Sequence, residues 1–135
     1  MARRAPRLPL GLVYDSGALI AAETNDRRMW ALHARAMQRG VLSVVPAGCV
    51  VEAWRGGRQP NLARLLDGCQ VEGLTAERAK RAGTLLRVAS ATIGPVDATV
   101  AEAAIRLGGA VVTSDRGDIE RLANGARRRL QVIEI

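Results

Sequence analysis

The chain has few aromatic residues. Its 135 residues include two Trp, one Tyr and no Phe. The core must therefore consist of Ala, Val, Leu and Ile, and aromatic platforms on which nucleic-acid bases stack are not expected. Hydrophobic residues still make up 48% of the chain and charged residues 24%, which excludes disorder of the whole chain. A chain of this length is expected to form one domain.

Lysine is also scarce, because Lys80 is the only one. Lys and Arg together number 20 against 13 Asp and Glu, so the formal net charge of +7 is carried almost entirely by arginine. The planar guanidinium group binds phosphate through two parallel hydrogen bonds. A nucleic-acid partner is one explanation of this excess, and a codon bias toward arginine and alanine is the other.

Cysteine and long apolar runs give little signal. Cys49 and Cys69 are far apart and the chain has one His, so neither a zinc site nor a disulfide framework is indicated. The stretch 41–51 is interrupted by Pro46 and is shorter than the roughly 18 apolar residues of a membrane span. The start of the chain imitates an export signal, but Asp15 interrupts its apolar part. We expect reduced cysteines, no membrane partner and a cytoplasmic location.

Strand and helix patterns alternate along the chain. Residues 1–9 carry three Arg and two Pro without periodicity and are expected to form a basic N-terminal arm, followed by one domain over residues 10–135. Strands are expected at 12–14, 41–45, around 71, at 110–114 and at 130–135. Helices are expected at 16–22, 26–39, 46–54, 61–66, 75–90, 96–107 and around 119–122, with Ser16 as the cap of the first. This alternation predicts an α/β domain, with a central parallel sheet and helices on both faces.

Four carboxylates lie within apolar segments. Asp15 follows L-V-Y, Glu52 lies in C-V-V-E-A-W, Asp97 lies in P-V-D-A-T-V-A, and Asp115 follows V-V-T-S. Burying an ionised carboxylate costs several kcal/mol unless another group compensates its charge. No basic residue adjoins the first three in sequence. A metal ion is one natural compensation.

The expected fold brings these acids together. Ligands of parallel α/β sheets bind beyond the carboxyl ends of the strands, and Asp15 and Asp115 follow two such ends. Asp97 lies in the first turn of its helix, where the helix dipole favours a negative charge. Asp118 lies three residues after Asp115 and can share one side of a helix start with it. A site with carboxylates alone suits Mg²⁺ or Mn²⁺.

The order of these segments resembles the PIN-domain ribonucleases, and among them the VapC-type toxins of bacterial toxin-antitoxin pairs. The resemblance rests on V-Y-D-S-G-A-L at 13–19, a lone Glu52 after the second strand, V-D-A-T-V-A-E-A-A at 96–104 and V-V-T-S-D-R-G-D at 111–118. It extends over about residues 12–135. Two departures are that the segment before Asp97 lacks the His or Tyr often found there, and that Gly17 stands where a bulkier residue is common.

The resemblance implies a function and a set of site residues. It implies a single PIN-like domain acting as a metal-dependent endoribonuclease, with Mg²⁺ or Mn²⁺ activating a water that attacks an RNA phosphodiester. The implied catalytic and metal-binding acids are Asp15, Glu52, Asp97 and Asp115, with Asp118 as a fifth metal ligand. Either Glu52 or Asp97 would assist proton transfer. The implied partners are RNA, a cognate antitoxin that neutralises the toxin and covers its groove, and a second copy in a homodimer.

Neighbouring residues have two interpretations each. The hydroxyl groups of Thr113 and Ser114 are expected to orient Asp115 or a metal-bound water, or else to serve only the turn. Arg55 and Arg58 flank Gly56 and Gly57 after Glu52 and are expected to hold RNA phosphates, or else to form a solvated end of their helix. The run 127–129 is expected to face solvent before the last strand, or else to contact RNA.

Other interpretations remain open. Asp15, Asp97 and Asp115 are also suitable helix caps or first-turn acids, whereas Glu52 lies too far into its helix to cap it. With caps alone, the chain would be a non-catalytic nucleic-acid-binding module whose RNA affinity needs no metal. A phosphoacceptor signalling domain is a weaker alternative, because it requires a positioned lysine and Lys80 lies in the middle of a charged helix.

The remaining polar residues are assigned no role in the site. The other acids, Glu72 and Glu102 among them, are expected to be solvated. His33 is expected at the boundary of an amphipathic helix rather than in catalysis.

Overall fold

The central sheet is parallel throughout. The computed structural model describes residues 11–89 and 92–135, so the expected basic arm lies outside the described residues. Within them, five strands form a sheet of order β3-β2-β1-β4-β5, and each neighbouring pair is parallel. The strands are β1 (Gly11–Tyr14), β2 (Leu42–Pro46), β3 (Gln70–Glu72), β4 (Ala110–Thr113) and β5 (Gln131–Glu134). The predicted sheet is confirmed.

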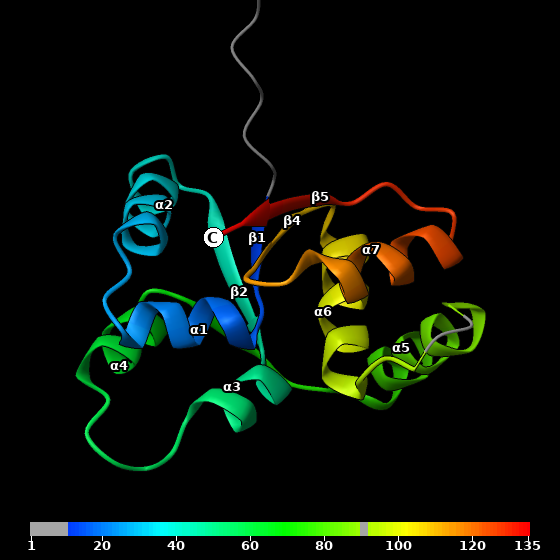
Figure 1. Cartoon of the computed structure of the whole chain (residues 1–135), viewed down its shortest axis with the longest axis horizontal. Helices are drawn as coiled ribbons and strands as arrows, with labels where there is room; N and C mark the ends of the chain where they lie inside the picture. Colours follow the sequence, from blue (N-terminus) through cyan, green and yellow to red (C-terminus); the bar gives the residue numbers. More distant parts are fainter. Residues whose placement is uncertain (1–10, 90–91) are drawn as a thin grey trace, which may run out of the picture.

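Helices cover both faces of this sheet, as predicted. They are α1 (Ser16–Glu23), α2 (Arg27–Gln38), α3 (Ala47–Ala53), α4 (Pro60–Asp67), α5 (Ala76–Ala89), α6 (Pro95–Leu107) and α7 (Arg116–Gly125). Figure 1 shows α1 to α4 on one side of the strands and α5 to α7 on the other. Among the described residues, no helix combines the length and apolarity that crossing a membrane requires.

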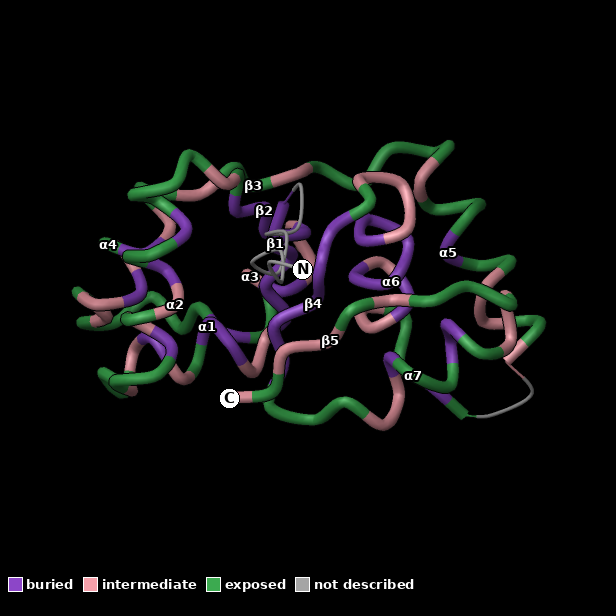
Figure 2. The backbone as a smooth tube through the Cα atoms, turned by 90° about the horizontal axis from the view of Figure 1, so that it is seen from above, coloured by how far each residue is buried: buried purple, intermediate pink, exposed green. Residues whose placement is uncertain are grey.

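The core lies between the central strands and the helices α1 and α6. All residues of β1 and β4 are buried, which Figure 2 shows as a continuous purple path through the middle of the molecule. Helices cover both faces of these strands, so they read as continuous apolar runs rather than alternating ones. Helix α6 contributes mainly alanines, including the fully buried Ala98, Ala101 and Ala104. Aliphatic packing thus replaces aromatic packing, and Tyr14 is the one aromatic side chain that is fully buried.

The start of α1 differs from the prediction. Asp15, not Ser16, is the N-cap, and its Oδ1 accepts a hydrogen bond from the Ala18 N–H at 2.9 Å. The cap therefore lies at the residue that directly follows β1, and Ser16 is the first residue of the helix. This change leaves the Ser16 hydroxyl free to make a tertiary contact.

Two acids that were expected to be solvated form ion pairs in the packed interior. Glu102 is 5% exposed and contacts Arg81 at 3.2 Å and Arg106 at 3.1 Å. Arg106 also pairs with Glu72, so one guanidinium joins α6 to β3 while Glu102 joins α6 to α5. These carboxylates raise the pKa of Arg106, and the ion pairs tie the helices of this side to the sheet edge. The prediction was wrong because Glu72 pairs with Arg106 of α6, and Glu102 pairs with Arg81 of α5 as well as with Arg106 on its own helix.

The single histidine is also buried rather than at a boundary. Ser43 donates to the Tyr14 hydroxyl at 3.1 Å, and that hydroxyl lies 2.8 Å from Nδ1 of His33. Burial lowers the pKa of His33 and raises that of Tyr14, so both groups are neutral near neutral pH. This contact joins α2 to the two strands β1 and β2.

Candidate active site

The predicted acids surround the carboxyl ends of β1 and β4. Asp15 follows β1, and its N–H donates to the Val112 carbonyl of the neighbouring strand β4 at 3.1 Å. Asp115 follows β4 after one intervening residue and is the N-cap of α7. Asp97 lies in the first turn of α6, which packs against both strands. Three helix starts therefore face this end of the sheet, and each carries an aspartate.

Asp97 is the electrostatic centre of this group. Burial raises its pKa to about 6, and the negative charges of Asp118, Asp15, Glu52 and Asp115 add to that rise. These four residues are the other acids of the predicted set. The other four predicted carboxylates therefore lie near enough to Asp97 for their charges to act on it, although the five acids lie on, or directly before, four different helices.

Asp15 is the most deeply buried of the five. It is 8% exposed, and burial raises its pKa, as does the charge of Glu52. Hydrogen bonds from Thr113 and from the N–H groups of Ala18 and Gly17 oppose that rise. These hydrogen bonds hold the carboxylate in a fixed orientation at the floor of the site.

Four of the five acids are held by other partners. Asp15 and Asp115 accept backbone N–H groups, the latter that of Gly117 at 3.1 Å. The remaining pairs are Glu52 with the Ser16 hydroxyl at 2.5 Å and Asp118 with Arg121 at 2.7 Å. The prediction that Asp15 and Asp115 cap helices is therefore correct, and capping does not prevent these acids from binding a metal as well. Asp97, in contrast, makes no side-chain hydrogen bond or ion pair within the described residues.

The donor set fits a hard divalent cation in its chemistry. All five side chains offer carboxylate oxygens, and their mutual repulsion is what a cation would relieve. Within residues 11–89 and 92–135, no three His, Cys, Asp or Glu side chains are gathered into a coordination shell.

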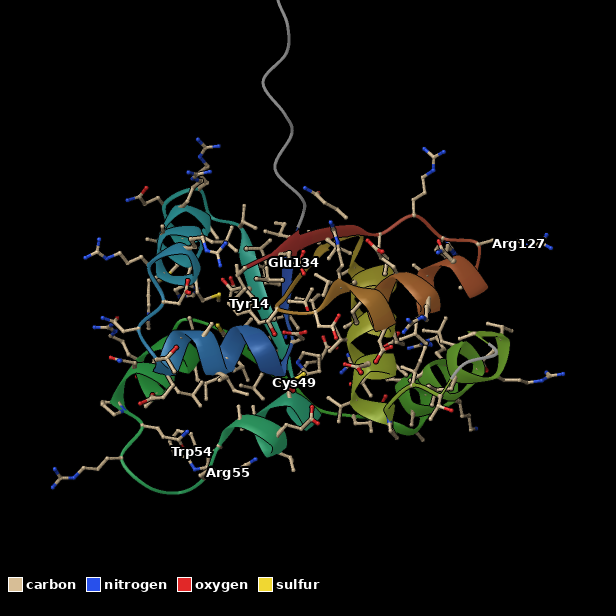
Figure 3. The ribbon with its side chains drawn as sticks, viewed as in Figure 1. Tyr14, Cys49, Trp54, Arg55, Arg127 and Glu134 are labelled. Atoms are coloured by element: carbon tan, nitrogen blue, oxygen red, sulfur yellow. The ribbon has the colours of Figure 1, made fainter. Side chains whose placement is uncertain are left out.

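Ser16 and Cys49 belong to the site although sequence reasoning assigned them no role there. The Ser16 hydroxyl donates to Oε1 of Glu52 at 2.5 Å, and Cys49 lies on the same helix as Glu52, one turn before it. Cys49 is fully buried, and Figure 3 shows it between the start of α1 and α3. Burial, with the charges of the neighbouring acids, raises the pKa of its thiol to about 12, so it stays protonated. Their positions in the sequence could have indicated this. Ser16 directly follows Asp15, and Cys49 precedes Glu52 by about one helical turn.

Thr113 fixes the turn that leads to Asp115. It is fully buried, and its hydroxyl accepts from the Asp115 N–H and donates to the Asp115 carbonyl, both at 3.0 Å. Ser114, in contrast, is exposed and packs against Gly17.

The predicted phosphate-binding arginines have different surroundings. Arg55 donates through Nη1 to the carbonyl groups of Val51 at 3.1 Å and Trp54 at 3.0 Å, which end α3. The alternative prediction, that Arg55 belongs to the end of its helix, is therefore correct for the Nη1 group. Arg58 is exposed in the following loop. Figure 3 shows Arg55 beside Trp54 at one end of the molecule and Arg127 at the opposite end.

These features define an α/β domain with a carboxylate-rich site at the carboxyl ends of a parallel sheet. The PIN domain matches residues 13–125, so the chain belongs to the PIN domain family. The predicted family resemblance is confirmed. No curated protein sequence matches the chain significantly.

Solved structures share this fold. The VapBC2 complex of Rickettsia felis bound to a promoter DNA fragment gives a TM-score of 0.69 at 15% identity, over 92% of this chain and 98% of that one. A toxin-antitoxin complex from Klebsiella pneumoniae gives 0.64 at 16% identity, over 93% and 100%. FitAB bound to an IR36 DNA fragment gives 0.60 at 14% identity, over 91% and 94%.

Proposed function

We propose that this PIN domain is a metal-dependent endoribonuclease toxin of the VapC type. The observation that carries the proposal is the placement of Asp15 and Asp115 after the neighbouring strands β1 and β4 and of Asp97 at the start of α6, which packs against both strands. Asp97 has no partner among the described residues, and burial together with the charges of the other acids raises its pKa. Such an arrangement destabilises the free protein and is explained by a cation that the acids bind. Catalytic sites, unlike structural ones, commonly concentrate groups with perturbed pKa values in this way.

The proposed metal ligands are Asp15, Asp97 and Asp115, with Glu52 and Asp118 at the periphery. Bound Mg²⁺ or Mn²⁺ supplies Lewis acidity toward a phosphodiester and toward an attacking water. Thr113 holds the backbone of Asp115 in place through its two hydrogen bonds. Ser16 orients Glu52, so that either Glu52 or Asp97 can accept the proton that the attacking water gives up.

The partners are proposed from charge and from the related structures. RNA is the proposed substrate because the chain carries a net charge of +7, almost entirely from arginine, with Arg55 and Arg58 next to the helix that holds Glu52. A cognate antitoxin is the proposed inhibitor, since two of the related structures are those of a VapBC complex and a toxin-antitoxin complex. A homodimer and a cytoplasmic location complete the proposal.

A non-catalytic nucleic-acid-binding module is the second candidate. One observation favours it, namely that Asp15 and Asp115 do cap α1 and α7. Capping alone does not explain Asp97, whose side chain caps nothing because α6 begins after Gly94. Asp97 is therefore the residue whose substitution separates the two functions.

The deciding experiment compares the full chain with Asp97→Asn and Asp115→Asn. Cleavage of a mixed RNA pool is followed in Mg²⁺, in Mn²⁺ and in chelator, and thermal melts are recorded with each. We expect metal-dependent cleavage by the wild type, loss of cleavage in both variants, and an Mn²⁺-induced rise in Tm only where the acids are intact. Unchanged cleavage by both variants would refute the metal-binding role of these acids, and RNA affinity with no cleavage and no response to metal would favour the binding module instead.

A further inference from the structure

One basic side chain lies among the acids and has no assigned role so far. Arg121 follows Asp118 by three residues on α7, and its Nη1 donates to Asp118 Oδ1 at 2.7 Å. The Arg121 side chain is 61% exposed and that of Asp118 is 34% exposed. The pair therefore lies on the solvent-exposed side of the group of acids, whereas Asp15 lies on its buried side.

The guanidinium turns back toward the start of α7. A Cβ placed on Gly117 would lie 3.9 Å from Nη1 of Arg121 and 3.4 Å from Oδ1 of Asp115. The guanidinium therefore lies near both acids that follow β4, in space that a larger residue at position 117 would fill. Asp118, the acid that it neutralises, is also the charged residue that raises the pKa of Asp97 most.

Arg121 keeps unused hydrogen-bonding capacity in this position. A guanidinium carries five N–H donors, and Nη1 makes the one hydrogen bond found for this side chain among the described residues. An exposed ion pair of this kind contributes little free energy and exchanges partners readily. Arginine is also the side chain best suited to bind a phosphate through two N–H groups.

Arg116 on the same helix differs. It pairs with Glu120 at 3.0 Å, and its Nη2 donates to the Val132 carbonyl of the edge strand β5 at 3.3 Å. Its guanidinium is thus directed at the sheet edge, whereas that of Arg121 is directed at the acids. The two residues form a matched pair, since each carries one charge and one intrahelical ion pair.

We propose that Arg121 is a phosphate-binding residue of this site, held by Asp118 in the free protein and passed to a non-bridging oxygen of the RNA backbone when Asp118 binds a divalent cation. The inference rests on the proposed function and deepens it. Five carboxylates repel an approaching phosphodiester. The guanidinium of Arg121, once released by Asp118, supplies a positive charge that offsets this repulsion. No covalent bond changes in this exchange, which replaces one oxyanion partner of the guanidinium by another.

The exchange has a signature that a structural ion pair lacks. Arg121 competes with the metal for Asp118 but assists the binding of RNA. Removing the charge of Arg121 should therefore strengthen metal binding and lower kcat/KM for RNA. An arginine that only pairs with Asp118 would, when removed, also free Asp118 for the metal, but it would leave kcat/KM for RNA and its salt slope unchanged.

The test uses the full chain with Arg121→Gln, Arg121→Lys and the control Arg116→Gln. In the absence of RNA, Mn²⁺ is titrated and the rise in Tm recorded. For Arg121→Gln we expect the apparent Kd for Mn²⁺ to fall by about fivefold, as the loss of one nearby competing charge implies. In Mn²⁺, kcat/KM for an oligoribonucleotide is then measured over a range of salt concentrations. We expect kcat/KM of Arg121→Gln to fall, and its logarithmic salt slope to flatten by about 0.7.

The controls separate the possible outcomes. Arg121→Lys should restore the salt slope, because lysine keeps the charge, and Arg116→Gln should leave both readouts near those of the wild type. Equal values for Arg121→Gln and Arg116→Gln, or a weaker Mn²⁺ response in Arg121→Gln, would overturn the inference. If the wild type neither responds to Mn²⁺ nor cleaves RNA, the proposed function itself fails.

Discussion

Gly17 of α1 lies directly against Ser114, the residue between β4 and Asp115. A Cβ at Gly17 would lie 3.0 Å from the Ser114 Cβ and 3.2 Å from its backbone nitrogen, and it would overlap the Ser114 hydroxyl. The missing side chain thus permits the start of α1 to approach the turn after β4. This approach keeps Asp15 close to Asp115 and explains why a bulkier residue does not occupy position 17.

Gly17→Ala should therefore destabilise the protein. The Ser114 hydroxyl can rotate, but its backbone nitrogen cannot move without shifting the end of β4, so we expect a loss of about 1–3 kcal/mol in the free energy of unfolding. The rise in Tm with Mn²⁺ should also shrink, because the two acids move apart. Both quantities are measured by denaturant unfolding and thermal melts.

Gly83→Ala is the matched control for this substitution. Gly83 lies within α5, and a Cβ there would meet no atom within 4 Å. The same chemical change should raise stability by about 0.5–1 kcal/mol, since alanine favours a helix more than glycine does. Equal stability changes at the two positions would show that the contact with Ser114 is not close in solution.

Asp97 should make the metal-free protein less stable as the pH rises. Its pKa is about 6 in the folded state and near 3.8 otherwise, so between these values the folded protein binds a proton that the unfolded chain has released. The contribution of Asp97 to the free energy of unfolding is therefore greatest below about pH 4, decreases between about pH 4 and pH 6, and stays low above pH 6. Asp97→Asn has no such titration and should be more stable near neutral pH by about 1–2 kcal/mol, with partial exposure limiting the gain.

The measurement is urea unfolding of the wild type and Asp97→Asn in chelator over this pH range. The two free-energy curves should converge at low pH and separate as the pH rises, and RNA cleavage by the variant should be lost in Mg²⁺. A parallel pair of curves would mean that Asp97 is not surrounded by the other acids. Asp15, whose pKa is also raised, leaves a remaining slope in both proteins.

Sequence reasoning reached the sheet and the acids because both depend on local patterns. Buried parallel strands are short apolar runs, and an acid after such a run must lie at the carboxyl edge of the sheet. For this reason Asp15 and Asp115 could be placed from their neighbours alone. Placing Glu52 in the site required the family resemblance. Glu52 lies within α3 and does not follow a strand end, so its sequence neighbours do not show where its side chain lies relative to the sheet.

The features that sequence reasoning missed depend on tertiary contacts of long or small side chains. Glu102 has the sequence surroundings of a solvated helical acid, and only the packing of α5 against α6 gives it Arg81 as a partner. Ser16 was expected to be the cap, with Asp15 as an alternative, because both residue types cap helices and their order in the sequence does not choose between them. Arg121 is three residues from Asp118, but spacing alone does not show that the pair borders the other acids.

Arg55 and Arg58 should differ when each is replaced by alanine. Arg55 donates two hydrogen bonds to the end of α3, so its loss should cost about 1 kcal/mol of stability and disturb the helix that carries Glu52. Arg58→Ala should change stability by less than about 0.5 kcal/mol but should flatten the salt dependence of RNA binding by about 0.7.

Unfolding free energies and RNA affinities in chelator over a salt series provide both readouts. If Arg58→Ala keeps the salt slope of the wild type, the loop after α3 does not contact RNA. If Arg55→Ala is as stable as the wild type, its hydrogen bonds to the carbonyl groups of α3 are replaced by water at no cost.

The ion pairs of Glu102 should support the fold without affecting the chemistry. Glu102→Gln keeps the size of the side chain but removes the charge that offsets Arg81 and Arg106. Removing one partner of a buried ion pair costs about 3–5 kcal/mol. The cost here should be nearer 2–3 kcal/mol, because Arg81 is 53% exposed and Arg106 retains Glu72.

Glu120→Gln provides the contrast, since Glu120 and its partner Arg116 are both about half exposed and such pairs contribute at most about 1 kcal/mol. Thermal melts should therefore show a large fall in Tm for Glu102→Gln and a small one for Glu120→Gln. Below its own melting temperature, Glu102→Gln should still cleave RNA in Mg²⁺, because the charges that raise the pKa of Asp97 do not include Glu102. Loss of cleavage in a folded Glu102→Gln protein would instead mean that these ion pairs hold α6, and with it Asp97, in the position that the site requires.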